Sequence, residues 1–388
     1  MNLVPARVYL DHAATTPMLD EARSAWLEAS RALGNPSSLH TSGRASRRIV
    51  EEAREAIAAD LDVRPGELIF TSGGTEADNL AIKGLYWQSG RSLIACSPIE
   101  HHAVLDPVHW LQQHDGAQTY WLEVDAFGRV QPADVAALLE QRADELALIS
   151  VMWANNEIGT VQPVHEIAAL CGEHRVPFHT DAVQALGMVP LDLAGLDAVT
   201  ISSHKVGGPF GVGALVLRRE VTVTPLLHGG GQERDVRSGT FDAPNIAAFA
   251  AAVHHAVAHQ AQHAAELTAL RDELIRRVRD VVPDAVLNGD PVDRLPGNAH
   301  FSFPGCEGDA LLMLLDAAGI DCSTGSACTA GIPEPSHVLL SIGVAEDQAR
   351  GSLRFSLGRT STGADVDALI AALPDAVARA QRAGSARR

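Results

Sequence analysis

The chain of 388 residues is long enough for one large or two medium domains, and its 46% hydrophobic and 20% charged residues are ordinary for a globular protein. Its formal net charge of −18 argues against nucleic-acid binding, because neutralising phosphates requires a basic face. The sequence shows no signal-peptide pattern and no stretch of membrane-spanning length, which argues against membrane insertion. Its five cysteines include no CxxC pair, which argues against a disulfide framework and a structural zinc site. We therefore expect a cytoplasmic protein with reduced thiols and with neither nucleic acid nor membrane as a partner.

Helices and strands alternate over the first 217 residues. A short extended segment at 8–10 is followed by amphipathic helices at about 19–33 and 43–61. The later predicted elements are strands at 67–71, 92–96, 119–122, 146–152, 198–202 and 212–217, another strand ending at 181, and helices at 77–87, 98–114, 132–141 and 164–174. This alternation predicts a mostly parallel sheet covered by helices on both faces.

The strand at 67–71 runs into a glycine-rich turn that opens a helix, Ser72-Gly73-Gly74-Thr75-Glu76. Free backbone N–H groups and the positive end of the helix form a cradle for an anion, and Thr75 adds a hydroxyl donor. The turn is neither a Walker A loop nor a dinucleotide-binding fingerprint. Taken alone, the turn is more simply interpreted as a helix start that binds no ligand.

Two other polar residues stand where predicted strands end. His101 lies at a strand–helix junction, and Asp181 ends the strand before Ala182. Functional groups gather at the carboxyl ends of strands in α/β sheets. A carboxylate there can hold a pyridine nitrogen protonated, which makes pyridoxal phosphate (PLP) an electron sink. The alternatives are a junction histidine without a function and an aspartate that caps the next turn.

The stretch TISSHKVGGPFGVG, at 200–213, contains Lys205, one of only two lysines beside 28 arginines. A lysine amine loses its proton and acts as a nucleophile, whereas guanidinium remains protonated. We therefore interpret Lys205 as the residue that binds a cofactor aldehyde as an imine. The alternative is a surface lysine in a glycine-rich turn, and for Lys83, inside a predicted helix, an exposed lysine is the simpler interpretation.

The alternating pattern ends at Leu217. A polar, glycine-rich loop at 228–240 is followed by a long helical tract at about 245–281 that joins two domains. His255, His259 and His263 recur every four residues on one face of this tract. A metal site is conceivable, but no carboxylate or cysteine completes it nearby, so a solvated helix face is the preferred interpretation.

The last quarter predicts a smaller α+β unit. It has a strand at 298–303, a helix at 308–318, a short strand at 320–322 and a final helix at 365–383. Small residues and glycines at 323–335 predict a mobile segment, and Cys328 within it lacks bulky neighbours, so a reactive thiol is favoured over a buried structural cysteine. Arg354 alternates with apolar residues in a strand at 352–359 and is suited to binding a carboxylate.

These segments, in this order, resemble the cysteine desulfurases of the NifS/IscS type, within the aminotransferase class V group of fold-type I PLP enzymes. Ten segments carry the resemblance: YLDHAATTP, GNPSS, TSGGTEADNLAIKG, EHHAVLD, NNEIGTVQP, HTDAVQALG, SSHKVGGPFGVGAL, HGGGQERDVRSGT, STGSACTAG and RFSLGR. The resemblance implies an α/β fold with a seven-stranded, mostly parallel sheet in a large domain, and a smaller α+β C-terminal domain. The implied boundaries are 15–260 for the large domain, and 1–14 with 261–388 for the small domain that carries the cysteine loop.

The resemblance also implies a role for each matching residue. Lys205 would bind PLP and move the Cα proton, and Cys328 would attack the substrate sulfur. His101 would stack on the cofactor ring, Asp181 would pair with its nitrogen, and Gln184 would bond its hydroxyl oxygen. The remaining positions are Gly74, Thr75, Ser202 and His204 for the phosphate, Thr240 for the phosphate of a neighbouring subunit, and Arg354, Asn155 and Asn35 for the substrate carboxylate.

The implied reaction converts L-cysteine to L-alanine and leaves a persulfide on Cys328. The implied partners are a second copy of the chain, in a homodimer, and a sulfur acceptor or iron–sulfur scaffold that serves cluster assembly or tRNA thiolation. No metal of its own is implied, although Cys328 is a candidate cluster ligand in a partner complex. The alternatives are a selenocysteine lyase or aminotransferase of the same fold, and a silent sulfur-relay scaffold, which the presence of Lys205, Asp181 and Cys328 disfavours.

Overall fold

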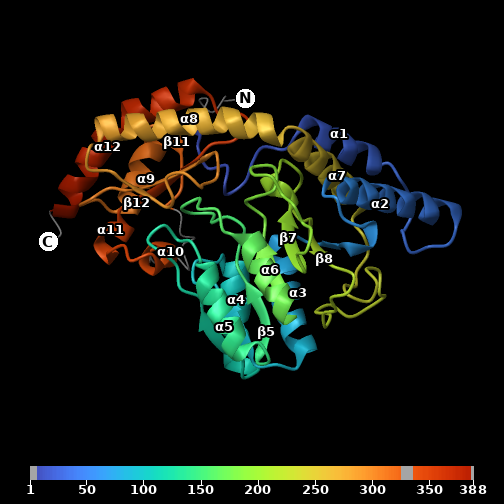
Figure 1. Cartoon of the computed structure of the whole chain (residues 1–388). Helices are drawn as coiled ribbons and strands as arrows, with labels where there is room; N and C mark the ends of the chain where they lie inside the picture. The colour runs from blue at the N-terminus through green and yellow to red at the C-terminus, as the bar shows by residue number, and fades with distance from the viewer. Residues whose placement is uncertain (1–6, 325–334, 386–388) are drawn as a thin grey trace.

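The computed structural model describes residues 7–324 and 335–385, and its largest feature is a seven-stranded sheet (Figure 1). The strand order is β2-β8-β7-β6-β5-β3-β4. The strands are β2 (Leu68–Thr71), β3 (Leu93–Cys96), β4 (Gln118–Trp121), β5 (Leu146–Ser150), β6 (Phe178–Asp181), β7 (Ala198–Ser202) and β8 (Gly213–Leu217). All neighbours are parallel except that β8 is antiparallel to β2 and β7. The predicted mostly parallel sheet is confirmed.

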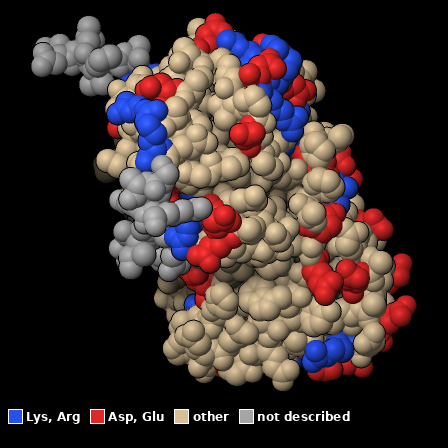
Figure 2. Space-filling model, turned by 90° about the vertical axis from the view of Figure 1, so that its left-hand side faces the viewer, with Lys and Arg blue, Asp and Glu red and all other residues tan. Residues whose placement is uncertain are grey.

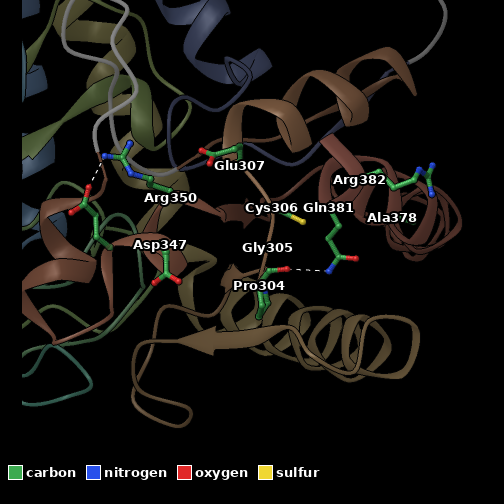
Figure 3. A pocket seen from close by; sticks show the side chains of 10 residues that line it. Pro304, Gly305, Cys306, Glu307, Asp347, Arg350, Ala378, Gln381 and Arg382 are labelled. Carbon is green, nitrogen blue, oxygen red and sulfur yellow. Dashed lines mark hydrogen bonds and ion pairs between the residues drawn. The ribbon is translucent and has the colours of Figure 1, made fainter. Parts of the chain in front are cut away.

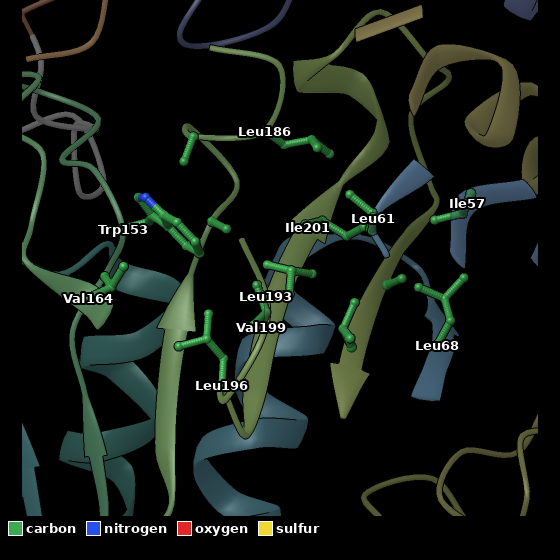
Figure 4. Packing of buried hydrophobic residues seen from close by; sticks show 14 of the residues in the cluster. Ile57, Leu61, Leu68, Trp153, Val164, Leu186, Leu193, Leu196, Val199 and Ile201 are labelled. Carbon is green, nitrogen blue, oxygen red and sulfur yellow. The ribbon is translucent and has the colours of Figure 1, made fainter. Parts of the chain in front are cut away.

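Alternate residues of each strand point to opposite faces of this sheet, and helices cover the apolar side chains on both faces. On one face, Ile69 and Ala198 pack with apolar side chains of α3 and α4. On the other, Leu68, Val199 and Ile201 join a larger cluster (Figure 4) with α2, α5, α6 and α7. The helices are α1 (Asp20–Ala29), α2 (Thr41–Asp60), α3 (Gly74–Ser89), α4 (His102–His114), α5 (Pro132–Arg142), α6 (Val164–His174) and α7 (Ala243–Ala258).

A smaller α+β unit follows, with its own hydrophobic cluster. Its antiparallel sheet has the order β12-β10-β9, and β1 pairs in parallel with β11. Within the cluster Phe301, Phe303 and Phe355 are fully buried, each worth about 1.5–3 kcal/mol of burial free energy. The elements are β1 (Val8–Tyr9), α8 (Gln260–Val281), β9 (Val286–Asn288), β10 (Asn298–Ser302), α9 (Gly308–Ala317), β11 (Ile320–Asp321), α10 (His337–Ser341), α11 (Glu346–Arg350), β12 (Ser352–Ser356) and α12 (Gly363–Ser385).

The long helical tract predicted for 245–281 is divided in two. α7 ends at Ala258 and α8 begins at Gln260, with His259 between them at φ −109° and ψ 5°. The ring of His259 stacks on the rings of His255 and His263, with centroids 4.4 Å and 5.6 Å away. Within residues 7–324 and 335–385, no three His, Cys, Asp or Glu residues are arranged to hold a metal ion, and no helix is long and apolar enough to span a membrane.

The polar loop at 228–240 is anchored by a buried ion pair. The Arg54 guanidinium donates to both carboxylate oxygens of Glu233, at 2.9 and 3.0 Å, and lies over the Phe70 ring. The two paired side chains are 8% and 2% exposed. Arg54 therefore ties the loop to α2.

Replacing Glu233 with glutamine is expected to reduce the free energy of unfolding by up to about 3–5 kcal/mol, because it leaves the buried guanidinium with only Glu51, which is 35% exposed, as a counter-charge. The matched control is Glu52→Gln, which removes an exposed pair with Arg48 and is expected to cost less than about 1 kcal/mol. Urea unfolding of both variants measures the difference, and equal midpoints would contradict the prediction.

Candidate active site

A cavity of about 260 Å³ opens at the carboxyl ends of β6 and β7 and at the N-termini of α3 and α4. This is the edge where α/β sheets bind ligands, because the strands end there and helix N-termini point at the space. The cavity contains eight of the predicted site residues together with five others. Its lining residues are Gly74, Thr75, Asp78, His101, Ala103, Met152, Asn156, Asp181, Val183, Gln184, Ser202, His204 and Lys205.

Lys205 reaches the cavity from the short 3-10 turn that follows β7. Its amine donates hydrogen bonds to the backbone oxygens of Ala13 and Ala14, at 2.6 and 2.9 Å. Desolvation, and then the charge of Arg354, lowers the pKa of Lys205 to about 8, although Asp181 and Asp11 oppose the shift. A substantial neutral fraction is therefore present near physiological pH, as a nucleophilic amine requires.

The glycine-rich turn places the start of α3 at one wall. α3 begins at Gly74, so the N–H groups of its first turn have no helical partner and face outward. A side chain at Gly74 would crowd this wall, because its Cβ would lie 3.1 Å from Val183 Cγ2. Ser202 and His204 line the same cavity. This wall has the donor set and the space that an anion such as a phosphate needs.

Asp181 ends β6 and lies among other buried acids. Its Oδ1 accepts a 2.8 Å hydrogen bond from Val183 N, so the capping contact considered above is present at a cavity residue. Burial, and then the neighbouring Asp78, raises the pKa of Asp181 to about 8. Burial also raises the pKa of Asp78 to about 7 and that of Glu100 well above its usual range. Such a cluster attracts a cationic group, because a nearby positive charge favours the ionised carboxylates.

Asp78 and Glu100 were missed by the sequence analysis. Asp78 lies on α3 with Ala77, Leu80 and Ala81, all fully or almost fully buried. An acidic residue on the apolar face of a helix is a usable signal, because a charged group is rarely buried without a function or a partner. Asp78 Oδ1 lies 3.4 Å from His179 Nε2.

His101 caps the N-terminus of α4. Its Nδ1 accepts a 3.1 Å hydrogen bond from Ala103 N, and its side chain is exposed toward the cavity. Desolvation, and then the charge of Lys205, lowers the pKa of His101 to about 4. The ring is therefore neutral at physiological pH, and a neutral flat ring suits stacking on another aromatic system.

His204 and Gln184 contact the chain near its N-terminus. His204 Nδ1 lies 3.3 Å from Thr15 Oγ1, and Gln184 Nε2 donates to Ala13 O at 2.9 Å. The His204 ring also stacks on Phe210, with centroids 5.2 Å apart. Burial, and then Lys205, lowers the pKa of His204 to about 4, so it is a neutral hydrogen-bonding group.

Four predicted site residues lie outside the cavity lining. Asn155 is fully buried, donates to Ile99 O and accepts from the backbone of the next turn, while its neighbour Asn156 lines the cavity. Arg354 is 4% exposed and bonded to Asn156 O and Asp11. Asn35 and Thr240 are exposed in the single chain. Cys328, the predicted sulfur nucleophile, lies outside the described residues.

A second cavity, of about 900 Å³, lies in the smaller unit (Figure 3). Gln381 donates to Pro304 O across it, and Arg350 pairs with Glu346 at its edge. The Cys306 thiol at its wall is buried, which raises its pKa to about 11 and keeps it protonated. None of the predicted site residues lines this cavity, so size alone does not locate the chemistry.

Charges of both signs are mixed on the molecular surface. On the face shown in Figure 2, the lysine and arginine side chains stand next to aspartates and glutamates and form no separate basic surface. With the net charge of −18, this distribution gives nucleic acid no attractive face there.

Comparison with known proteins identifies the family to which the chain is similar. A family model described as "Aminotransferase class-V" matches residues 8–369. The "IscS-like cysteine desulfurase" of Mycobacterium tuberculosis is 56% identical over 387 residues, covering 97% of this chain and 98% of that protein. A solved "NifS-like protein" superposes with a TM-score of 0.89 at 33% identity, over 96% of this chain and 100% of that chain. "SspA in complex with cysteine" gives 0.79 at 31%, over 92% and 100%. The resemblance predicted from the ten sequence segments is confirmed.

Proposed function

Because the chain belongs to the aminotransferase class-V family, we propose that it is a PLP-dependent cysteine desulfurase, which converts L-cysteine to L-alanine and transfers the sulfur to Cys328. One observation carries the proposal. A desolvated lysine amine, a helix N-terminus and a buried aspartate converge on one cavity, as a phosphorylated pyridine aldehyde requires.

The residues of the cavity fit this cofactor. Gly74 and Thr75, at the start of α3, would hold the phosphate with Ser202 and His204. Asp181 would pair with the ring nitrogen, since a cation beside a buried carboxyl favours its ionised form. His101 would stack on the ring, and Gln184 would bond the ring oxygen. When bound, PLP supplies an electron sink that stabilises negative charge at the substrate Cα.

Lys205 would hold the cofactor before substrate arrives and then move the Cα proton. Its pKa of about 8 lies near the operating pH, so both protonation states are accessible, which is the condition for efficient proton transfer. The Ala13 and Ala14 carbonyls keep the amine in place. The substrate carboxylate would be bound by Arg354, Asn155 and Asn35, of which only Arg354 is permanently charged.

The sulfur step is assigned to Cys328. Its thiolate would form an S–S bond to the substrate sulfur while the Cβ–S bond breaks and leaves its electron pair on Cβ, which then gains a proton. The four described cysteines are buried, and burial raises the pKa of each, so they are poor nucleophiles near neutral pH. They are Cys96, Cys171, Cys306 and Cys322.

The assembly and location are part of the same proposal. We place the enzyme in the cytoplasm as a homodimer in which Thr240 reaches the phosphate bound to the partner subunit. The exposure of Thr240 in the single chain supports this role. The persulfide would pass to an acceptor protein for iron–sulfur cluster assembly or tRNA thiolation.

Replacing Cys328 with serine is expected to reduce sulfide release from L-cysteine by about 10²-fold or more, because serine cannot form the S–S bond. The visible absorption band of bound PLP should stay unchanged. Cys322→Ser is the matched control and should retain activity, since that thiol is 8% exposed and its pKa is raised to about 12.

The same measurements separate the alternatives. Undiminished sulfide release from Cys328→Ser, or a strong preference for selenocysteine, would point to a selenocysteine lyase. 3-Mercaptopyruvate in place of alanine as the product would point to an aminotransferase, because transamination replaces the Cα amine with a carbonyl and leaves the Cβ–S bond intact. A protein without an absorption band after addition of PLP would contradict the cofactor and, with it, the enzyme.

A further inference from the structure

The turn between β1 and α1 connects the chain's N-terminal segment to the last strand of the smaller sheet. Asp11 forms a bridge with Ser356 of β12, and Ala13 N donates to Ser356 Oγ at 2.9 Å. Ala14 N donates to Asp11 O at 3.0 Å and closes the turn. In Figure 1 this segment runs from beside β11 toward α1, between the two units. The turn is thus held at the active site by β12.

The same turn touches several residues of the cavity. Lys205 and Gln184 both donate to Ala13 O, and Lys205 also donates to Ala14 O. Thr15 lies within hydrogen-bonding distance of His204. These carbonyls hold the lysine amine, whereas the charged side chain of the turn, Asp11, contacts Arg354.

The Asp11 carboxylate pairs with Arg354. Arg354 Nη2 lies 2.7 Å from Asp11 Oδ1, and Arg354 Nη1 donates to Asn156 O at 2.8 Å. The two paired side chains are 5% and 21% exposed. Two acceptors from distant segments therefore fix the plane of one buried guanidinium, while its Nε–H has no partner among the described residues.

Building on the proposed function, we propose that Asp11 is a positioning residue, which holds the guanidinium of Arg354 in the orientation that receives the substrate's α-carboxylate. Arginine has five N–H donors, and Asp11 and Asn156 O engage only two of its nitrogens. The remaining donors are sufficient for a second carboxylate. Asp11 thus contributes to selecting amino acids over amines that lack the carboxylate.

Asp11 also has a cost for anion binding, since its charge repels a second carboxylate. Orientation outweighs this repulsion because an unpaired guanidinium that is 4% exposed would turn toward another acceptor or toward water. Arg354 also lies close enough to Lys205 to lower its pKa, so an unanchored Arg354 would have a second reason to move away. Loss of Asp11 is therefore expected to weaken carboxylate binding.

The test uses two stable ligands, N-phosphopyridoxyl-L-alanine and N-phosphopyridoxyl-ethylamine, which differ only in the α-carboxylate. Calorimetry measures their affinities for the full-length, cofactor-free chain, and Asp11→Asn keeps the size and an acceptor oxygen while removing the charge. We expect the alanine ligand to bind Asp11→Asn about tenfold or more weakly, and the ethylamine ligand to bind within twofold of the wild type. Asp20→Asn, at an exposed pair with Arg23, is the control and should change neither affinity.

Two further measurements connect the effect to Arg354. In the Arg354→Gln variant, adding Asp11→Asn should cause no additional loss of affinity for the alanine ligand, because the carboxylate contact is already absent. In the holoenzyme, Asp11→Asn should raise KM for L-cysteine by a similar factor and leave kcat within about threefold, as expected for uniform binding.

The outcomes distinguish this inference from the proposed function. If neither ligand binds the wild type, the cofactor site itself is wrong, and if both bind equally, Arg354 does not hold the carboxylate; each result removes the basis of the inference. If the wild type prefers the alanine ligand and Asp11→Asn keeps that preference or increases it, only the role of Asp11 is overturned. An equal loss of both ligands also overturns it, because Asp11 would then serve only the fold.

Discussion

Replacing Lys205 with alanine is expected to lower turnover of L-cysteine by at least about 10²–10⁴-fold, the range that a positioned proton-transfer group supplies. The loss of the covalent attachment adds to this effect. Borohydride reduction of the protein loaded with PLP should attach the cofactor to Lys205 in the wild type and to no lysine in the variant. Peptide mass spectrometry reads the result.

The composition of the chain provides a strict control. Lys83 is the only other lysine, and its amine lies 4.3 Å from the Trp110 ring, outside the cavity lining. Lys83→Ala should keep both turnover and the labelled peptide. Because the pKa of Lys205 is about 8, the rate of PLP attachment should rise about tenfold per pH unit below 8 and level off above it. A rate independent of pH, or a label on Lys83, would contradict the assignment.

Replacing Asp181 with asparagine is expected to lower turnover by about 10²–10³-fold, comparable to removing one preorganised charge from an active site. An asparagine keeps the acceptor for Val183 N but offers no negative charge to a ring nitrogen. PLP should still attach to Lys205, with an altered absorption spectrum. Asp181→Glu should restore part of the turnover.

Asp192→Asn is the matched control for Asp181. Asp192 Oδ1 accepts from Ala194 N at 2.9 Å, the same two-residue contact that Asp181 makes with Val183, but on the exposed surface. If Asp192→Asn keeps wild-type turnover while Asp181→Asn loses most of it, the loss is due to the missing charge at the cavity. Equal losses would mean that only the turn geometry matters.

The sequence was most informative where chemistry and local structure coincide. Lys205, Asp181 and Gly74 stand at strand ends or helix starts, and parallel strands bring such positions to one edge of the sheet. The functional side chains predicted at the ends of these strands do lie at the cavity beside β6 and β7. The parallel sheet itself followed from regular alternation, since the spacing of apolar residues changes between strands and helices.

Prediction was weaker where distant segments meet. Asp11 and Arg354 are 343 residues apart, so no local pattern reports their contact. Asn155 was assigned to substrate from its motif, yet its side chain is bonded to the backbone of its own turn and of Ile99. The interruption at His259 was missed because the residues on both sides have helical periodicity, and only packing against two different units separates them.

The long separation in sequence between Asp11 and Arg354 also has a consequence during synthesis. Asp11 is translated 343 residues before its partner Arg354 on β12. At about 5–20 residues per second, the N-terminal segment waits roughly 20–70 s for Arg354. A nascent chain that stops before β12 would lack Ser356 and Arg354, which contact the turn at Asp11, so ribosome stalling before β12 should yield a protein that cannot yet organise its substrate site.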